Sequence, residues 1–158
     1  MKFEFSAGGV VFKKEKKNIF ILVAQHSQHH GWVFPKGLIG DKNETKSASA
    51  KGSGPLRQSD SETSETKEEA ALREVEEETG VIGKIIRPLT PVTYWYVFEK
   101  VKIKKTVYYF LMEYVSGDIT QHDMEMENVE WLQADEVEKR LTYKSDKQVW
   151  QEAKKLVK

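Results

Sequence analysis

The first 40 residues alternate short apolar runs with charged or turn-forming residues, a pattern that predicts β-strands joined by tight turns. Residues 7–12 and 19–24 form two such runs, and the charged segment 13–18 between them predicts a hairpin. After a polar loop that contains three histidines, residues 32–37 predict a short strand that ends in a turn fixed by proline and glycine. This strand would deliver Lys36 to the turn.

One amphipathic helix is predicted in the middle of the chain. Thr66 and Glu69 have the spacing of a capping box, in which each side chain accepts a hydrogen bond from the backbone of the other. The helix should continue to Thr79 and end at Gly80, because glycine readily adopts the left-handed conformation that terminates helices.

The rest of the chain predicts four more strands, at residues 82–87, 92–98, 101–115 and 128–132. The third is apolar at most positions, which predicts a central place in a sheet. Strands on both sides of one acidic helix, closed by a further amphipathic helix, favour an α/β sandwich with a mixed β-sheet.

Two helices are predicted to close the chain, at residues 134–141 and 145–157. The second should begin with a capping box formed by Ser145 and Gln148. Its apolar stripe comprises Val149, Trp150, Ala153, Leu156 and Val157.

Residues 41–64 differ from their surroundings, because Leu56 is their only large apolar residue among many serines, lysines and acids. Such a segment buries too little surface to offset its ordering entropy, so we expect a flexible insertion. A tolerated surface loop is favoured over a binding element, since long loops add little closure entropy. The length of 158 residues otherwise suits one domain, over residues 1–158.

Composition narrows the chemistry further. Lys plus Arg and Asp plus Glu each number 25, so no net field draws the chain toward DNA or an anionic membrane. Cysteine is absent, which excludes disulfides, thiolate nucleophiles and Cys-ligated zinc. No apolar run approaches the roughly 20 residues that span a bilayer, so a soluble, cytoplasmic protein is expected.

Three carboxylates of the predicted helix, Glu74, Glu77 and Glu78, fall within an arc of about 100°. Like charges this close repel one another unless a cation neutralises them, and hard oxygen ligands favour Mg²⁺ or Mn²⁺. An acidic, solvated helix face is the alternative interpretation. Lys36 and Gly37 weigh against it, because a lysine beside a backbone turn suits a phosphate group.

Residues 65–81 resemble the Nudix box, which defines a glutamate, then Arg-Glu and an apolar residue, two glutamates, and a glycine with an apolar residue. These positions are filled by Glu65, Arg73-Glu74-Val75, Glu77-Glu78 and Gly80-Val81. The chain departs from the box only at its front, where 27 residues separate Gly37 from Glu65 and the family has five. The resemblance implies a Nudix-type α/β/α sandwich around a central mixed β-sheet.

The resemblance also implies roles for particular residues. Glu74, Glu77 and Glu78 would be metal ligands, and Arg73 would orient them. Many family members recruit a further carboxylate from a later loop as ligand or general base. Glu125 is the first candidate for that role and Glu127 the second, with a solvated acidic loop as the alternative.

The strand and helix segments around the box are most similar to the asymmetric diadenosine tetraphosphate hydrolases. This likeness implies a substrate-binding set of Lys36, Gly37, Tyr94, Tyr96 and Lys105. Tyrosine rings can stack on a purine, and lysines can neutralise a polyphosphate. A place in the core or on the sheet surface is the commoner fate of a tyrosine.

These features together predict a Mg²⁺-dependent pyrophosphohydrolase that cleaves a nucleoside diphosphate linked to a further group, in particular diadenosine tetraphosphate to ATP and AMP. The alternatives are hydrolysis of ADP-ribose, of an oxidised nucleoside triphosphate, of an RNA 5′ end or of a diphosphoinositol phosphate. A catalytically silent, nucleotide-binding Nudix module is a further alternative. A monomer and a homodimer are both compatible with the sequence.

Overall fold

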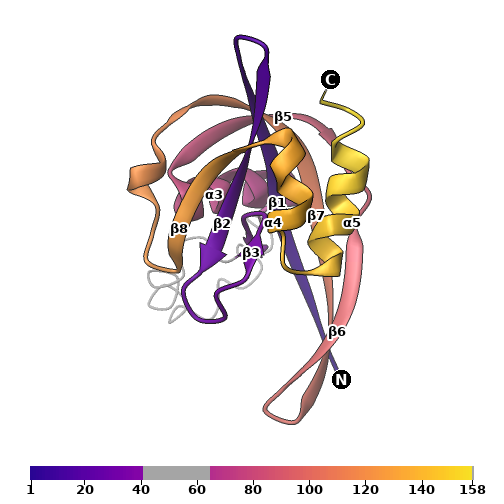
Figure 1. Ribbon diagram of the computed structural model, residues 1–158. Helices are drawn as coiled ribbons and strands as arrows, with labels where there is room; N and C mark the ends of the chain where they lie inside the picture. Colours follow the sequence, from indigo (N-terminus) through magenta and orange to yellow (C-terminus); the bar gives the residue numbers. More distant parts are fainter. Residues whose placement is uncertain (41–64, 158) are drawn as a thin grey trace.

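The computed structural model describes residues 1–40 and 65–157, so the flexible insertion predicted at 41–64 lies outside the described residues. Figure 1 shows one twisted sheet with helices on both of its faces. In chain order the described elements are β1 (Lys2–Glu15), β2 (Asn18–His26), β3 (Trp32–Val33), β4 (Lys36–Leu38), α3 (Lys67–Thr79), β5 (Val81–Pro88), β6 (Val92–Phe98), β7 (Val101–Gly117), the 3₁₀ turn η2 (Ile119–Gln121), β8 (Met126–Gln133), the 3₁₀ turn η3 (Ala134–Glu136), α4 (Val137–Arg140) and α5 (Lys144–Ala153). None of the described helices is long and apolar enough to cross a membrane.

The strands form a mixed sheet, as predicted. Its main path runs β3-β2-β1-β7-β5, with β4 attached to β1, β6 to β7 and β8 to β2. The two long central strands, β1 and β7, are parallel, and the other pairings are antiparallel. The prediction that residues 101–115 form a central strand is confirmed, because β7 lies between β1 on one side and β5 and β6 on the other.

The sheet buries both of its faces, because side chains alternate along each strand. On β1, Val10 belongs to the core under α5, whereas its neighbour Val11 belongs to the core under α3. Val75 of α3 is fully buried in one core, and Trp150 of α5 is 2% exposed in the other. The predicted α/β/α arrangement follows from these two cores.

The helix α3 begins and ends as the sequence predicts. Thr66 accepts a hydrogen bond from the Glu69 amide, and Glu69 accepts one from the Thr66 amide, both at 3.0 Å. Gly80 has a φ of 83°, and its amide donates to the Glu76 carbonyl. The chain then passes directly into β5, which packs α3 against the sheet.

The C-terminal helices differ from the prediction. Residues 134–141 form a 3₁₀ turn and the single-turn helix α4, not one continuous helix. The capping box at Ser145 is wrong, because α5 starts at Lys144 and its N-cap, Tyr143, makes no side-chain cap. Leu156 does not belong to the buried stripe, being 37% exposed beyond the end of α5.

The segment predicted as one strand at 32–37 is two short strands, β3 and β4, separated at Phe34 and Pro35. The Pro35 carbonyl accepts a hydrogen bond from the Gly9 amide at 3.2 Å. A Cβ at Gly8 would overlap this carbonyl, so glycine is required for the two segments to approach. The pairing of β4 with β1 places Lys36 opposite Gly8, near the middle of β1.

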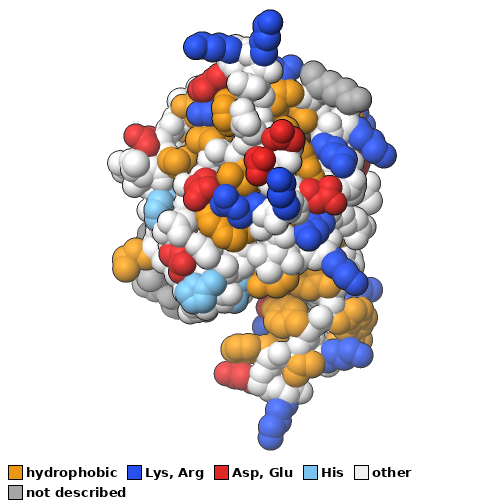
Figure 2. Space-filling model, in the orientation of Figure 1, with side chains coloured by type: hydrophobic (Ala, Val, Ile, Leu, Met, Phe, Trp, Pro, Cys, Tyr) orange, Lys and Arg blue, Asp and Glu red, His pale blue; other side chains and the backbone are white. Residues whose placement is uncertain are grey.

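The β6–β7 hairpin projects from the body of the protein (Figure 1). Glu99 and Lys100 both have positive φ values, 50° and 68°, and form the two-residue turn whose twist suits a hairpin. This turn fixes the register that pairs Tyr94 with Lys105. Exposed apolar side chains gather at the projecting end of the molecule in Figure 2, where Val97 is 68% exposed.

Candidate active site

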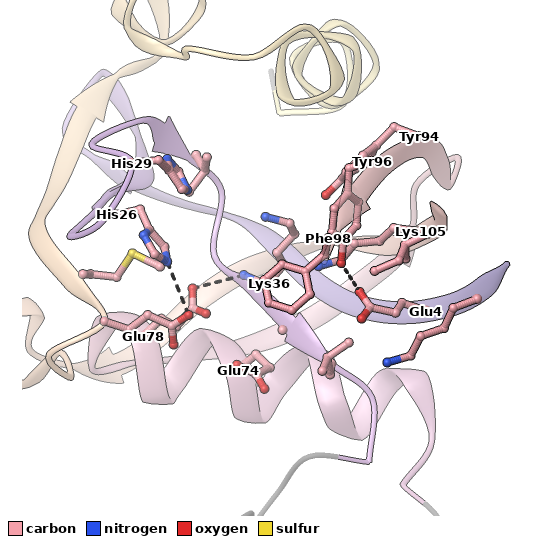
Figure 3. A pocket seen from close by; sticks show the side chains of 17 residues that line it. Glu4, His26, His29, Lys36, Glu74, Glu78, Tyr94, Tyr96, Phe98 and Lys105 are labelled. Atoms are coloured by element: carbon pink, nitrogen blue, oxygen red, sulfur yellow. Dashed lines mark hydrogen bonds and ion pairs between the residues drawn. The ribbon is translucent and has the colours of Figure 1, made fainter. Parts of the chain in front are cut away.

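A cavity of about 620 Å³ lies between α3 and the β6–β7 hairpin (Figure 3). Most of the site residues predicted from the sequence line this cavity, although they come from five separate elements and loops. They are Lys36, Gly37, Glu74, Glu78, Tyr94, Tyr96, Lys105 and Glu125. Arg73, Glu77 and Glu127 do not line it.

The acidic side of the cavity is formed by α3. Glu74 and Glu78 are 6% and 2% exposed, which is unusual for carboxylates. Burial raises the pKa of Glu74 to about 7, although Arg73 opposes the shift. Burial and the charge of Glu125 raise the pKa of Glu78 well above its usual range. The Lys36 amide donates to Glu78 at 3.2 Å (Figure 3).

Arg73 does not line the cavity but forms ion pairs with three carboxylates of the acidic side. Its Nε and one terminal nitrogen bind both oxygens of Glu65, at 2.7 and 2.8 Å. Its other terminal nitrogen lies 2.7 Å from Glu74 and 3.2 Å from Glu77. The terminal nitrogen that binds Glu65 also donates to the Leu38 carbonyl at 3.1 Å, which ties α3 to the end of β4. Glu77 is therefore held at the rim, with 43% of its side chain exposed.

Glu65 is the first described residue after the predicted insertion. Its side chain accepts a hydrogen bond from the Gly40 amide at 2.8 Å while it pairs with Arg73. Residues 40 and 65 therefore lie side by side. Gly37 therefore lies close to the helix that carries the Nudix-box residues, although 27 residues separate it from Glu65 in the sequence.

Gly37 gives the acidic side its close contact with β4. A Cβ at this position would overlap the carboxylate of Glu74. The strand can therefore pass Glu74 closely only because residue 37 has no side chain. The Lys36-Gly37 pair thus contributes through its backbone as well as through the Lys36 amine.

The donors on the acidic side suit a hard divalent cation. They are carboxylate oxygens, and the raised pKa values of Glu74 and Glu78 indicate buried carboxylates that lack sufficient positive charge. Within residues 1–40 and 65–157, no three Asp, Glu or His side chains are grouped as a ready ligand set. Arg73 accounts for part of this arrangement, because it draws Glu74 and Glu77 toward itself.

The opposite side of the cavity is basic and aromatic. Burial and the neighbouring charge of Lys36 lower the pKa of Lys105. For Lys36 itself, burial would lower the pKa, but Tyr94, Asp146 and Glu78 outweigh burial and raise it. Two half-buried amines that repel each other favour an anion between them. The rings of Tyr94 and Tyr96 lie 6.5 Å apart on the same wall (Figure 3).

Several cavity residues were not identified from the sequence. The Tyr96 hydroxyl donates to Glu4 at 2.6 Å, and His26 and His29 form another part of the wall. Asp146 lies nearby, where it accepts a hydrogen bond from the Phe34 amide at 3.2 Å. The histidines were visible only as a polar loop, and no motif distinguishes Glu4 or Asp146 from surface acids.

Comparison with known proteins identifies the class. The model of the NUDIX domain matches residues 2–153, which is nearly the whole chain. The chain therefore belongs to the NUDIX family. Enzymes of this family generally use a divalent cation, in agreement with the oxygen donors of the acidic side.

Individual relatives resemble parts or all of the chain. A Mycobacterium tuberculosis (strain CDC 1551 / Oshkosh) protein named mutator protein MutT4 is 34% identical over 96 residues, or 61% of this chain. The match spans 39% of that relative, so the chain accounts for about two fifths of its length.

Solved structures share the fold at low sequence identity. The Ap4A hydrolase of C. elegans, solved as a binary complex, aligns with 98% of this chain and 97% of its own, at a TM-score of 0.60 and 16% identity. The NUDIX domain of Shewanella oneidensis NrtR, solved with ADP ribose, aligns with 100% of this chain and 90% of its own, at a TM-score of 0.68 and 20% identity.

Proposed function

We propose that this protein is a Mg²⁺-dependent pyrophosphohydrolase that cleaves diadenosine tetraphosphate asymmetrically to ATP and AMP. One observation carries the proposal: a single cavity joins the buried carboxylates of α3 to the lysines and tyrosines of the opposite wall. A substrate with several phosphates and two purines needs both kinds of surface, whereas a metal site alone needs only the first.

Glu74 and Glu78 would hold the metal ion, and Glu77 would join them after leaving Arg73. Mg²⁺ bound there supplies charge neutralisation to the phosphates and lowers the pKa of a water molecule, and Mn²⁺ is an acceptable substitute. Arg73 keeps the carboxylates in place through its contacts with Glu65 and Glu74. A retained set of repelling carboxylates also argues against a catalytically silent module.

Glu125 would act as the general base, because it lines the cavity near Glu78 and raises the pKa of that residue. It would accept the proton of the attacking water as the new P–O bond forms. The bridging P–O bond then breaks, and ATP departs with the electron pair while AMP retains the oxygen of water. Lys36 and Lys105 would neutralise the departing triphosphate.

The aromatic wall would receive the adenine bases. Tyr94 and Tyr96 present rings to the cavity, and stacking of a base on an aromatic ring contributes about 1–3 kcal/mol. The NUDIX domain solved with ADP ribose favours a different substrate, so the alternative substrates must be compared directly.

The test is a hydrolysis panel in ¹⁸O-labelled water with Mg²⁺. The panel contains diadenosine tetraphosphate, ADP-ribose, ordinary and oxidised nucleoside triphosphates, 5′-triphosphorylated RNA and a diphosphoinositol phosphate. The proposal expects the highest kcat/KM for the tetraphosphate, with ATP and labelled AMP as products, and loss of turnover with EDTA. A higher kcat/KM for another member, or nucleotide binding without turnover, would overturn it.

A further inference from the structure

Two histidines stack face to face at the edge of the cavity. His26 ends β2 and His29 lies in the following loop, and their ring centroids are 4.2 Å apart with an interplanar angle of 9°. Both line the cavity. The Nε2 of His26 lies 3.5 Å from a carboxylate oxygen of Glu125, which Figure 3 draws without a label at the end of the dashed line from His26. Neither histidine has a role in the chemistry described above.

Backbone amides determine where the proton of each ring resides. The Gln28 amide donates to Nδ1 of His26 at 3.1 Å, and the Gly31 amide donates to Nδ1 of His29 at 3.0 Å. An amide nitrogen is only a donor, so each Nδ1 must be an unprotonated acceptor. The neutral form of each ring therefore carries its proton on Nε2. For His26 that N–H lies nearest to Glu125.

Tyr143 contacts His29 as well. The Tyr143 hydroxyl lies 2.9 Å from its Nδ1, and the two rings meet edge to face with centroids 5.5 Å apart. Tyr143 is the residue that precedes α5 without capping it. The side chain at the start of α5 thus holds His29, and His29 holds the plane of the His26 ring by stacking.

We propose that His26 is a positioning residue, whose Nε2–H directs the carboxylate of Glu125 into the cavity. Glu125 needs such a contact, because its side chain is 54% exposed and belongs to a loop. The loop backbone is anchored by the Ser27 amide, which donates to the Glu125 carbonyl at 2.9 Å. The side-chain contact is longer than a strong hydrogen bond, and such contacts commonly tighten when substrate binds.

The segments that contain His26 and Glu125 also form a second histidine–glutamate pair, which serves as a control. His30 binds Glu127 at 2.9 Å, a shorter contact than that between His26 and Glu125. Neither His30 nor Glu127 lines the cavity. If these histidines only tied the two loops together, the His30 pair should matter at least as much. If His26 positions Glu125 for chemistry, only the His26 pair should affect turnover.

The kinetic test compares His26→Ala, His26→Gln and His30→Ala on the Mg²⁺-loaded protein, and it relies on the proposed hydrolysis. His26→Ala is expected to lower kcat about 10-fold or more with KM nearly unchanged, since general-base catalysis contributes about 10²–10⁴-fold in all. His26→Gln should recover most of the loss, because its amide nitrogen can replace Nε2–H. Equal losses in His26→Ala and His30→Ala, or no recovery in His26→Gln, would overturn the proposal.

A second test needs no substrate and remains valid if the proposed hydrolysis is wrong. The chain has four histidines, so ring ¹H–¹⁵N correlations of the metal-free protein can be assigned with single variants. We expect the Nε2–H tautomer for His26 and His29. Glu125→Gln should shift the His26 signals and leave those of His30 unchanged, and Glu127→Gln should do the converse. A His26 proton on Nδ1, or no response to Glu125→Gln, would refute the positioning role.

Discussion

The acidic and the basic sides of the cavity are built in different ways. The acidic side comes from one stretch of chain, residues 65–78, in which Glu65, Glu74 and Glu77 share the contacts of Arg73. The basic and aromatic side joins Lys36 on β4 with residues of β6 and β7, and only the sheet register brings these together. A local motif therefore determines where a metal ion would bind, whereas long-range pairing determines what else the cavity accepts.

The largest effect should come from the acidic side. Glu78→Gln is expected to lower kcat by about 10³-fold, equivalent to about 4 kcal/mol of barrier, because a neutral amide binds the cation much more weakly than a carboxylate does. The fold should survive, since the pKa of Glu78 is already raised by burial and the amide has the same shape. Turnover and thermal unfolding are measured together. Glu76→Gln, on the exposed face of the same helix, is the matched control, and near-normal turnover of Glu78→Gln would contradict the assignment.

Arg73→Ala tests how much one residue contributes to holding Glu65, Glu74 and Glu77 on the acidic side. The substitution removes the guanidinium group from Glu65 and Glu74, although both carboxylates are less than 10% exposed. Removing one member of such a buried pair lowers the free energy of unfolding by about 3 kcal/mol. Denaturant unfolding measures the loss. Arg73→Lys should recover only part of it, because an ammonium group cannot make the paired contacts to Glu65. Full recovery would show that charge alone matters.

The basic side offers a test of register. Lys105 lines the cavity, whereas its neighbour Lys104 points to the other face of the hairpin, with its amine 5.6 Å from the Trp95 ring. Lys105→Met should raise KM about 10-fold, as expected for the loss of one charge-assisted contact to phosphate. Lys104→Met should change KM less than about 2-fold, within the range of exposed charges. Equal effects in steady-state kinetics would mean that only the total charge of the hairpin counts.

The smallest effect concerns Tyr96. Burial and the hydrogen bond to Glu4 raise the pKa of this phenol to about 12. Between the unfolded value of 10.0 and 12 the folded protein holds the proton more tightly, so its stability should fall as pH rises through this window. Glu4→Gln should lower the phenol pKa and make the fall shallower. Alkaline absorbance titration, with Tyr96→Phe to identify the signal, would detect it, and an unchanged curve would refute the coupling.

The sequence predicts elements well where the signal is local. Thr66, Glu69 and Gly80 define both ends of α3, because capping depends on residues a turn apart. Ser145 shows the limit of this reasoning. The capping box there is equally good by spacing, yet α5 begins at Lys144, because tertiary contacts such as that between Tyr143 and His29 override the local preference.

The residues of the candidate site also differ in whether local sequence signals can predict them. The carboxylates of α3 could be named from their spacing, and Lys36 from its turn. The contact between His26 and Glu125 joins residues 99 positions apart, and that between Tyr96 and Glu4 joins residues 92 positions apart. No periodicity or motif connects such residues, since their meeting depends on strand register and loop path.

The parallel pairing of β1 with β7 has a consequence for how the protein is made. Its register joins Lys2 to Ile103 and Phe12 to Glu113, so each ladder contact spans about a hundred positions. Such high contact order slows folding, and a nascent chain cannot form the centre of the sheet until β7 has left the ribosome. Until then β1 exposes Val10 and Val11 on opposite faces, so this strand is among the last to be protected from aggregation although it is synthesised about a hundred residues before its partner.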